Sequence, residues 1–492
     1  MMFRPRPDQG ERLAFNAPVP SGASLSTGAS PVHPDSRASG DAESAVVPAA
    51  EPRDRAFTWM LLFTIVLFTR PQDIIRPLDF LHLAELTAIA GLVSLISGRM
   101  ARGQPFTRVT PELVGVVAFG AVILFTAPFS IWMGGAVGVF KDLYSKVILV
   151  YLLAVNTITT PKRLERFTWV LVLSVSYVSL LTMMDYLRGT NVWAHGTRAV
   201  GAVNGFMANP NDLATNMVAF LPLAAFMAMR RSTAIKRVTA ASCAVLMLAT
   251  AIASGSRGGF LGMIVMILVF GAMAVRKRPG LIVAAVLAGM CALPLVPSSY
   301  WHRIASITDE SKDDYGSAEA RRTLARESME AFAENPLTGV GAGNFKAWKP
   351  SRDGAWHESH NVVLQVAAEL GLVGLAVFFF LVGRAFQGVL QTRRLLRQAR
   401  RAAAARRQGR AVQANAPQIT AEEAEMLDAH SAAMLASLCG WFVCAIFASV
   451  AYNWTLYYLL ALAASPRDIL RDRLPRRATA AANARAIEVV HA

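Results

Sequence analysis

The chain has 492 residues, of which 54% are hydrophobic and only 17% are charged, and its mean hydropathy is positive. This composition excludes an ordinary soluble protein, because apolar runs long enough to cross roughly 30 Å of hydrocarbon recur along the chain. The net charge of +16 at pH 7 is typical of nucleic-acid binding, unless the charges instead mark the loops of a membrane protein. We predict an all-α polytopic membrane protein with about 12 transmembrane helices.

Residues 1–55 are rich in Pro, Ser, Gly and Ala and contain no apolar stretch. They cannot bury enough apolar surface to fold alone, and they lack the apolar segment of a signal peptide. We therefore expect a disordered cytoplasmic tail there, followed by nine spans within 56–297 and three within 361–465. The predicted spans are 56–69, 80–97, 112–133, 140–157, 165–184, 211–229, 238–254, 258–275, 280–297, 361–383, 432–449 and 451–465.

The basic residues lie mostly on one side of these spans. Most of the 49 Lys and Arg fall in the two tails and in the loops 98–111, 158–164, 230–237, 276–279 and 384–431. Cytoplasmic loops of membrane proteins carry such an excess of Lys and Arg. We therefore expect both termini, the basic loop 384–431 and the tail 466–492 to be cytoplasmic. The positive net charge of the chain is then explained by its orientation in the membrane, and nucleic acid is not expected as a partner.

One large outer loop is expected at residues 298–360. Its stretch 319–334 has good helix formers with apolar residues at helical spacing, and Pro336 and a series of glycines then end the helix. This pattern predicts an amphipathic helix on the outer membrane surface, followed by a glycine-rich turn. The loop leads directly into the next predicted span.

The letters "WHESHN" at 356–361 place two histidines, a glutamate and an asparagine at the start of that span. A zinc site would have histidines four apart, as in H-E-x-x-H, but His357 and His360 are three apart, so no metal is expected. Asn361 is a good helix cap, although a cap needs no neighbouring imidazole. The third interpretation is acid–base chemistry, in which neutral His360 accepts a proton from a hydroxyl group.

Isolated arginines are expected on the same outer face. They are Arg188, Arg198, Arg257, Arg321 and Arg322. Arg257 is the most informative, because an arginine at the head of a span is costly in lipid and should face a polar cavity. Guanidinium groups suit bidentate binding of phosphate oxygens, whereas a snorkelling or solvated side chain is the alternative for each arginine. A histidine base with arginines nearby favours transfer from a lipid-linked phosphate ester.

Three segments together resemble the O-antigen ligase and polymerase superfamily of bacterial inner-membrane proteins. They are "SGSRGGFLGM", "ENPLTGVGAGNF" and "SHNVVLQVAAELGLVGL", and the upstream "RAVGAVNGFMANPNDLA" is also similar. The resemblance covers about residues 240–390. It implies a GT-C-like, metal-independent glycosyltransferase without a cofactor. Such an enzyme moves a finished glycan from undecaprenyl diphosphate to an acceptor hydroxyl at the periplasmic face of the inner membrane.

The resemblance also implies roles for particular residues. His360 matches the proposed general base, and Arg257 matches an arginine that holds the donor diphosphate. Arg321 occupies the place of a second such arginine, but this chain has Arg322 beside it, so the choice between the two stays open. Either Glu358 or His357 would orient the ring of His360. The expected substrate-binding residues are Arg198, Arg257, Arg321, Arg322, His357, Glu358 and Asn361.

Three acceptors stay open within this family. If the acceptor is lipid A core, the chain is a ligase of lipopolysaccharide synthesis. If it is a second repeat unit, the chain is a polymerase of O-antigen or exopolysaccharide. If it is a protein hydroxyl, the chain is an O-oligosaccharyltransferase. The segment "FTRPQDIIRPLDFL" resembles ligase-like members found with exopolysaccharide or exosortase loci. A glycan transporter is the alternative from a different class. Transporters usually place polar residues and helix breaks at mid-membrane, whereas here the polar groups gather at the outer rim of the membrane. Membrane lipid is a further expected partner.

Overall fold

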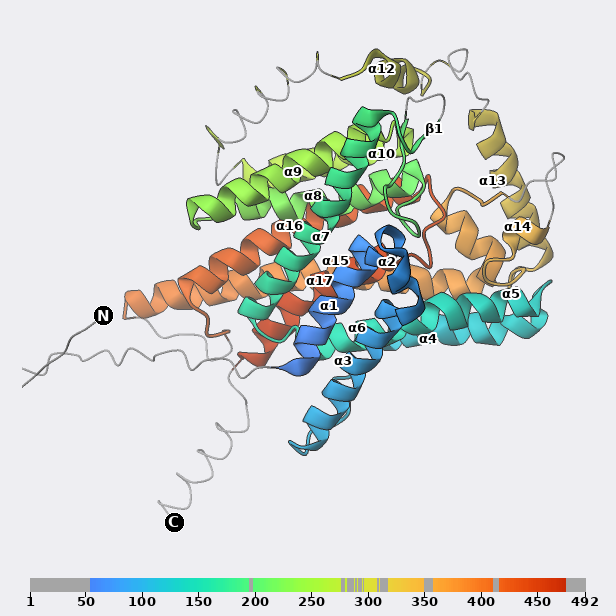
Figure 1. Cartoon of the computed structure of the whole chain (residues 1–492). Coiled ribbons are helices and arrows are strands. Elements are labelled where there is room, and N and C mark those ends of the chain that lie inside the picture. The colour runs from blue at the N-terminus through green and yellow to red at the C-terminus, as the bar shows by residue number, and fades with distance from the viewer. Residues whose placement is uncertain are drawn as a thin grey trace, which may run out of the picture. The chain divides into compact units, whose positions relative to one another are not determined.

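We describe a computed structural model of the chain, which covers residues 54–193, 198–275, 296–307, 317–348, 357–409 and 416–474 and a few single positions between 279 and 309. Helices dominate it (Figure 1). The first half contains α1 (Arg55–Thr69), α2 (Pro71–Ile74), η1 (Arg76–Leu81), α3 (Leu83–Met100), α4 (Pro111–Thr126), η2 (Ala127–Phe129), α5 (Met133–Gly138), η3 (Val139–Tyr144), α6 (Ser145–Thr157), α7 (Pro161–Arg188) and α8 (Pro210–Met229). The second half contains α9 (Ala234–Ala253), α10 (Arg257–Ala274), α12 (Ser298–Ala305), α13 (Ser317–Glu334), α14 (Phe345–Trp348), α15 (Val362–Arg407), α16 (Ala421–Ala445) and α17 (Trp454–Asp472). Strands β1 (Val192–Trp193) and β2 (Arg198–Ala199) pair antiparallel.

Eight helical segments among the described residues are long and apolar enough to cross a membrane. They are Pro77–Met100, Pro111–Phe129, α7, α8, α9, α10, α15 and α16. The predicted spans 56–69 and 140–157 overlap the shorter helices α1 and α6, and 451–465 overlaps α17, whose last turns carry several charged residues. The predicted span 280–297 lies almost wholly outside the described residues. The chain is therefore a multi-pass helical membrane protein, as predicted, and the number of twelve spans stays a prediction.

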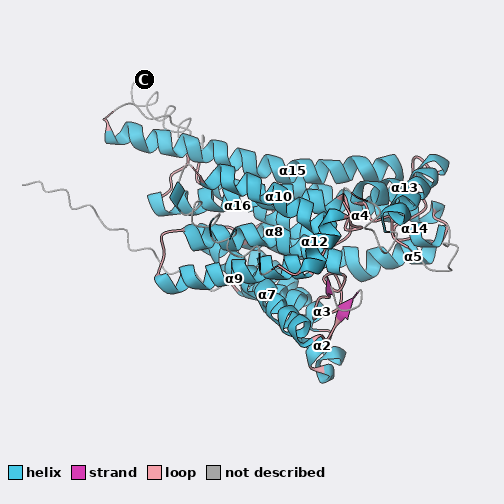
Figure 2. Cartoon of the chain, turned by 90° about the horizontal axis from the view of Figure 1, so that it is seen from above, coloured by secondary structure: helices cyan, strands magenta, loops and turns pink. Residues whose placement is uncertain are grey.

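Helix α15 is the longest helix of the described chain and extends past its neighbours (Figure 2). The sequence predicted a loop at 384–431, but α15 continues to Arg407 and α16 already begins at Ala421. Leu, Arg, Gln and Ala, which fill this stretch, are strong helix formers, so nothing ends the helix at 384. From Leu372 onward the helix is roughly 50 Å long, which exceeds the roughly 30 Å of a hydrocarbon core. Its basic end therefore extends beyond the apolar layer.

Helices α8, α10 and α16 lie side by side and pack through small residues (Figure 1). A Cβ atom at Gly440 of α16 would lie 2.7 Å from Val218 of α8 and 2.8 Å from Met266 of α10. A Cβ atom at Gly262 of α10 would collide with Cys444. Small residues allow such close contact between membrane helices, which lipid does not drive together by the hydrophobic effect. This packing holds the start of α10 against α16.

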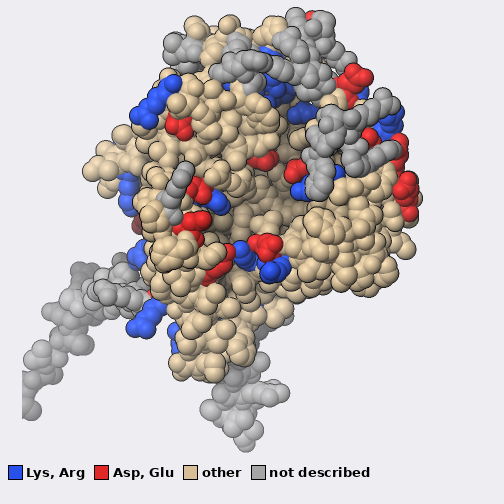
Figure 3. Space-filling view, turned by 45° about the vertical axis from the view of Figure 1, so that its right-hand side comes forward, with Lys and Arg blue, Asp and Glu red and all other residues tan. Residues whose placement is uncertain are grey.

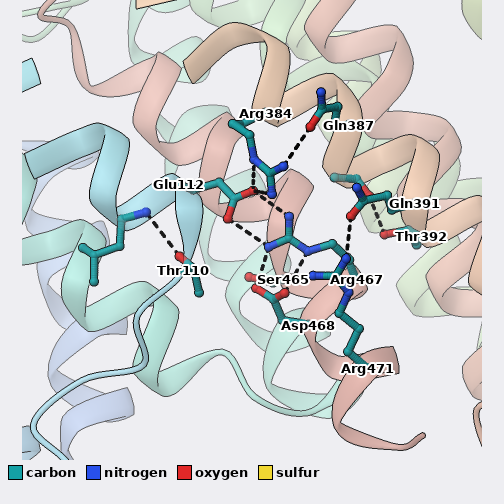
Figure 4. A network of polar contacts seen from close by, with 12 residues as sticks. Thr110, Glu112, Arg384, Gln387, Gln391, Thr392, Ser465, Arg467, Asp468 and Arg471 are labelled. Atoms are coloured by element: carbon teal, nitrogen blue, oxygen red, sulfur yellow. Dashed lines mark hydrogen bonds and ion pairs between the residues drawn. The ribbon is translucent and has the colours of Figure 1, made fainter. Parts of the chain in front are cut away.

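A buried ion-pair network joins α4, α15 and α17 (Figure 4). Arg467 donates to the two carboxylate oxygens of Glu112 at 2.6 and 2.9 Å, and Arg384 donates to Glu112 at 2.6 Å. The side chains of Glu112 and Arg467 are both 0% exposed. Such a pair adds little net stability compared with apolar residues, but removing one partner leaves an uncompensated charge.

We expect Glu112→Gln to lower the free energy of unfolding by about 3–5 kcal/mol, because Arg384 loses its carboxylate partner and the buried Arg467 keeps only that of Asp468. The matched control is Asp472→Asn, which removes the partner of Arg108 in an exposed pair. There we expect a loss of at most about 1 kcal/mol. Thermal denaturation of both purified variants in one detergent measures the difference. If both variants lose the same free energy of unfolding, burial does not determine how much the Glu112 network contributes to stability.

The start of α15 is interrupted at Gly371, where φ is +63° and ψ is −160°. The glycine-rich turn "NPLTGVGAG" enters this break. The backbone N–H of Val340 donates to the carbonyl of Ala368 at 2.9 Å, and that of Leu372 donates to the carbonyl of Pro336 at 2.8 Å. These bonds satisfy backbone groups that the broken helix cannot pair internally. The two sequence motifs, "NPLTGVG" and "ELG", thus form one structural unit.

Glu369 holds the turn from within α15. Its carboxylate accepts hydrogen bonds from the backbone N–H of Gly343 at 2.9 Å and from the hydroxyl of Tyr452 at 2.8 Å. The side chain of Asn344, at the end of the turn, donates to the carbonyl of Trp132 at 2.9 Å. The turn is therefore bonded to α15, to the α16–α17 connection and to the segment before α5.

We expect Gly371→Ala to lower the free energy of unfolding by more than about 2 kcal/mol. An L-residue is strained at this φ, and its Cβ atom would collide with the backbone carbonyl of Leu337. Gly383→Ala, in the same helix, is the control, because a Cβ atom there meets nothing within 4 Å. Alanine should stabilise that position slightly. Thermal denaturation distinguishes the two, and a Gly371→Ala protein as stable as the parent would contradict the interlocked arrangement.

Candidate active site

The letters "HESHN" lie directly before the first turn of α15. Asn361 caps this helix, since its Oδ1 accepts hydrogen bonds from the backbone N–H groups of Val363 at 2.9 Å and Leu364 at 3.1 Å. The predicted capping role of Asn361 is confirmed. The cap sets where α15 begins and thereby the position of the histidine before it.

His360 has a left-handed backbone with φ of +50°, which is uncommon for a residue other than glycine. Its backbone N–H donates to the hydroxyl of Ser449 at 3.0 Å, and the hydroxyl of Ser359 donates to the carbonyl of Asn361 at 3.1 Å. Ser449 belongs to the connection between α16 and α17. Strained backbone of this kind persists where surrounding contacts enforce it, and it is frequent at functional sites.

His360 and Asn361 line a pocket of about 380 Å³, which we call the arginine pocket. Its polar lining residues are Arg257, Ser306, Arg321, Arg322, Ser359, His360 and Asn361. No acidic residue lines it within the described chain. A site with several guanidinium groups and no carboxylate favours an anionic ligand, and a planar guanidinium matches phosphate oxygens in bidentate geometry.

Arg257 is the first residue of α10, and Ser256 caps that helix by accepting the backbone N–H of Gly259 at 3.1 Å. The arginine is only 8% exposed. Its Nη1 donates to the hydroxyl of Ser306, just after α12, at 2.9 Å. A cation at the head of an apolar helix is thus held in a defined direction, and it lines a cavity that Arg321 and Arg322 also line.

Arg321 and Arg322 enter the pocket from α13, which covers the predicted amphipathic helix. Arg321 is half-buried and Arg322 is exposed. Helix α13 packs on the start of α15 through a small apolar cluster that includes Ala331 and Ala368. The interlocked turn and this cluster together place the arginines of α13 beside His360.

Burial lowers the pKa of His360, and the positive charges of Arg321 and His357 lower it further. The ordinary pKa of histidine is about 6.5. The imidazole of His360 is therefore neutral at pH 7 and is able to accept a proton. Arg321 and His360 both line the arginine pocket.

Three predicted site residues lie outside the arginine pocket. Arg198 donates to the carbonyl of Ser254 at 2.9 Å and to Oδ1 of Asn211 at 3.0 Å, so it braces the turn before Arg257. His357 is exposed and does not line the pocket. Glu358 lines a different cavity. The described residues contain no group of three or more His, Cys, Asp or Glu side chains that could hold a metal ion.

The cavity with Glu358 has a volume of about 560 Å³, and we call it the carboxylate pocket. Ser359 lines both pockets, so the "HESHN" strand separates them. The side chain of Glu358 is exposed toward this cavity, but desolvation by the surrounding protein raises its pKa, while the charge of Lys346 and a hydrogen bond with Ser449 oppose that change. Figure 3 shows one face of the molecule hollowed, with acidic and basic side chains around the hollow.

Sequence reasoning missed Ser449 and Ser306, which bond His360 and Arg257. The predicted spans 432–449 and 451–465 left almost no connection between them. In the structure α16 ends at Ala445 and α17 begins at Trp454. The intervening letters "IFASVAYN" are mostly apolar, so composition does not distinguish this connection from a helix.

Residues 242–379 match the family model described as O-antigen ligase. The matched segment begins in α9 and ends in α15, so it contains the three segments on which the resemblance rests, the interlocked turn and His360. No curated protein matches the chain. The match supports ligase- or polymerase-type glycosyl transfer in general. The match at residues 242–379 supports the O-antigen ligase superfamily for this part of the chain.

Proposed function

We propose that the chain transfers a glycan from undecaprenyl diphosphate to an acceptor hydroxyl at the periplasmic face of the bacterial inner membrane. The observation that carries this proposal is the arginine pocket, where a neutral histidine and three arginines share a lining that contains no acidic residue among those the structure describes. Lipid A core, another repeat unit and a protein hydroxyl are the candidate acceptors. Both termini would be cytoplasmic, in accord with the positions of Lys and Arg.

Arg257 and Arg321 would bind the donor diphosphate. Arg257 is buried and directed by Ser306, whereas Arg321 reaches the pocket from α13. Between the two adjacent arginines, Arg321 is favoured over Arg322 because it is the more buried and its charge acts on His360. Fixed cations stabilise the negative charge that develops on a leaving diphosphate, and they need no reorganisation during the reaction.

His360 would act on the acceptor. Its neutral imidazole takes the proton of the acceptor hydroxyl as that oxygen forms a bond to the anomeric carbon of the donor glycan. The bond from that carbon to the diphosphate oxygen breaks, and undecaprenyl diphosphate leaves with the electron pair. The imidazolium then releases its proton to solvent. In-line attack of this kind inverts the anomeric centre.

The division of roles predicts different defects for the two residues. We expect His360→Ala to abolish transfer and leave binding of the lipid-linked donor largely intact, because the base acts only in the chemical step. Arg257→Ala should weaken donor binding and transfer together, and Arg257→Lys should restore little, since an ammonium lacks the bidentate fork. Donor retention and transfer are measured on each purified variant. Near-normal transfer by His360→Ala would refute the proposal and leave "HESHN" as a helix cap.

The lowered pKa of His360 predicts the pH dependence. His360 works when neutral, so kcat/KM should fall only as the pH drops below about 6.5, the ordinary histidine pKa. Arg321→Gln removes a positive charge that lowers this pKa. The acidic limb of the profile should then move to higher pH. Arg322→Gln is the matched control and should leave the limb in place. If the acidic limbs of the Arg321→Gln and Arg322→Gln profiles lie at the same pH, His360 is not the titrating group.

A further inference from the structure

We infer that the carboxylate pocket binds the acceptor glycan and selects one whose sugars are neutral or amine-bearing and carry no phosphate. This inference rests on the proposed function and specifies its acceptor. It follows from the position of this pocket relative to His360, from its charge and from two buried oxygen atoms that have no hydrogen-bond partner.

The two pockets meet at the strand that carries the proposed base. Ser359 lines both of them, His360 lines the arginine pocket, and Glu358 lines the carboxylate pocket. Ser449, which binds the backbone of His360, also lines the carboxylate pocket. Transfer requires two substrates to reach one catalytic group in a fixed geometry. Adjacent cavities on either side of that group satisfy this requirement.

The charge of the carboxylate pocket is opposite in character to that of the arginine pocket. Its acidic lining residues are Asp79, Glu85, Asp142, Glu358 and Glu369, and its basic ones are Arg70, Lys146 and Lys346. Lys146 is paired with Glu85 at 2.7 Å, and Arg70 is paired with Asp73 at 2.7 Å. Among the described lining residues, Asp79, Asp142 and Glu358 thus remain beside Lys346 and His82, because Glu85 is paired and Glu369 already accepts two hydrogen bonds. Like charge at a binding site selects strongly against a partner, so a phosphorylated glycan is disfavoured.

Two buried amide oxygens lack a partner at this pocket. The Oε1 atom of Gln72 and the Oδ1 atom of Asn453 make no hydrogen bond within the described chain, and both residues line the pocket. Asn453 stands at the cap position of α17, where an asparagine normally binds the first turn, yet its side chain makes no capping bond. Buried polar atoms are almost always bonded. A ligand that enters the pocket and turns either amide toward itself would supply the missing donor.

Sugar hydroxyls and protonated amines are such donors, whereas an ionised phosphate offers acceptors only. The pocket also presents apolar surface from Phe206 and Trp454, against which the carbon faces of a sugar ring can pack. Chemistry and charge thus agree on a non-phosphorylated glycan.

Ligand-observed NMR on the purified full chain in nanodiscs tests this inference without requiring turnover. Three soluble tetrasaccharides serve as probes: one of neutral hexoses, one of deacetylated amino sugars, and one of phosphorylated hexoses. We expect the first two to bind and the phosphorylated one to bind at least about tenfold more weakly. Asp79→Asn combined with Asp142→Asn should narrow that difference. Equal or tighter binding of the phosphorylated probe, or no binding of any probe, would overturn the inference.

Substitutions of Gln72 and Asn453 test whether the saccharide binds in the carboxylate pocket. Gln72→Ala and Asn453→Ala should each weaken binding of the neutral probe about threefold to tenfold, as expected for the loss of one hydrogen bond. Gln398→Ala, at an exposed position of α15, is the matched control and should change nothing. Unchanged binding in both amide variants would place the saccharide elsewhere.

Donor binding separates this inference from the proposed function. Retention of labelled undecaprenyl diphosphate should fall in Arg257→Ala and stay normal in Gln72→Ala. If the parent chain retains the donor and transfers its glycan while the saccharide results fail, only the acceptor assignment is wrong. If the parent chain neither retains the donor nor transfers a glycan, the proposed function itself is wrong, whatever the saccharides do.

Discussion

The insertion of the glycine-rich turn into the break of α15 positions both halves of the site. Gly371 interrupts the helix, and the turn supplies backbone donors and acceptors to the groups that the interruption exposes. Because α13 leads into this turn, its arginines are fixed relative to the start of α15, where His360 lies. In a membrane protein such unpaired backbone groups would be costly. The same bonds that satisfy them therefore bring a segment between two spans to His360, the proposed base.

Charged groups in this chain are stabilised in two different ways. Glu112 and Arg467 are fully buried and neutralise each other, and their network ties three helices together (Figure 4). Arg257 is nearly as buried, but it lines a cavity in which the described lining residues include two further arginines and no carboxylate. The first arrangement pairs charges of opposite sign. The second gathers charges of one sign at a cavity, which is the arrangement that the proposed anionic donor requires.

The sequence predicted the features that depend on local pattern. The apolar runs indicated membrane helices, the spacing within 319–334 indicated α13, and the motifs singled out His360 and Arg257. It did not predict Ser449, Gln72 or Asn453, since an isolated Ser, Gln or Asn has no signal apart from the fold around it. It also grouped Glu358 with His360, because the two are neighbours in the chain, whereas the structure separates them into different pockets.

The segment that separates the two pockets is held firmly. His360 has a left-handed backbone, its N–H donates to Ser449, and Asn361 follows at once as the cap of α15. Glu358 lines the carboxylate pocket, whereas His360, two residues later, lines the arginine pocket. In the proposed reaction this segment would divide the site of the anionic leaving group from the site of the acceptor, with the proposed proton acceptor beside their boundary.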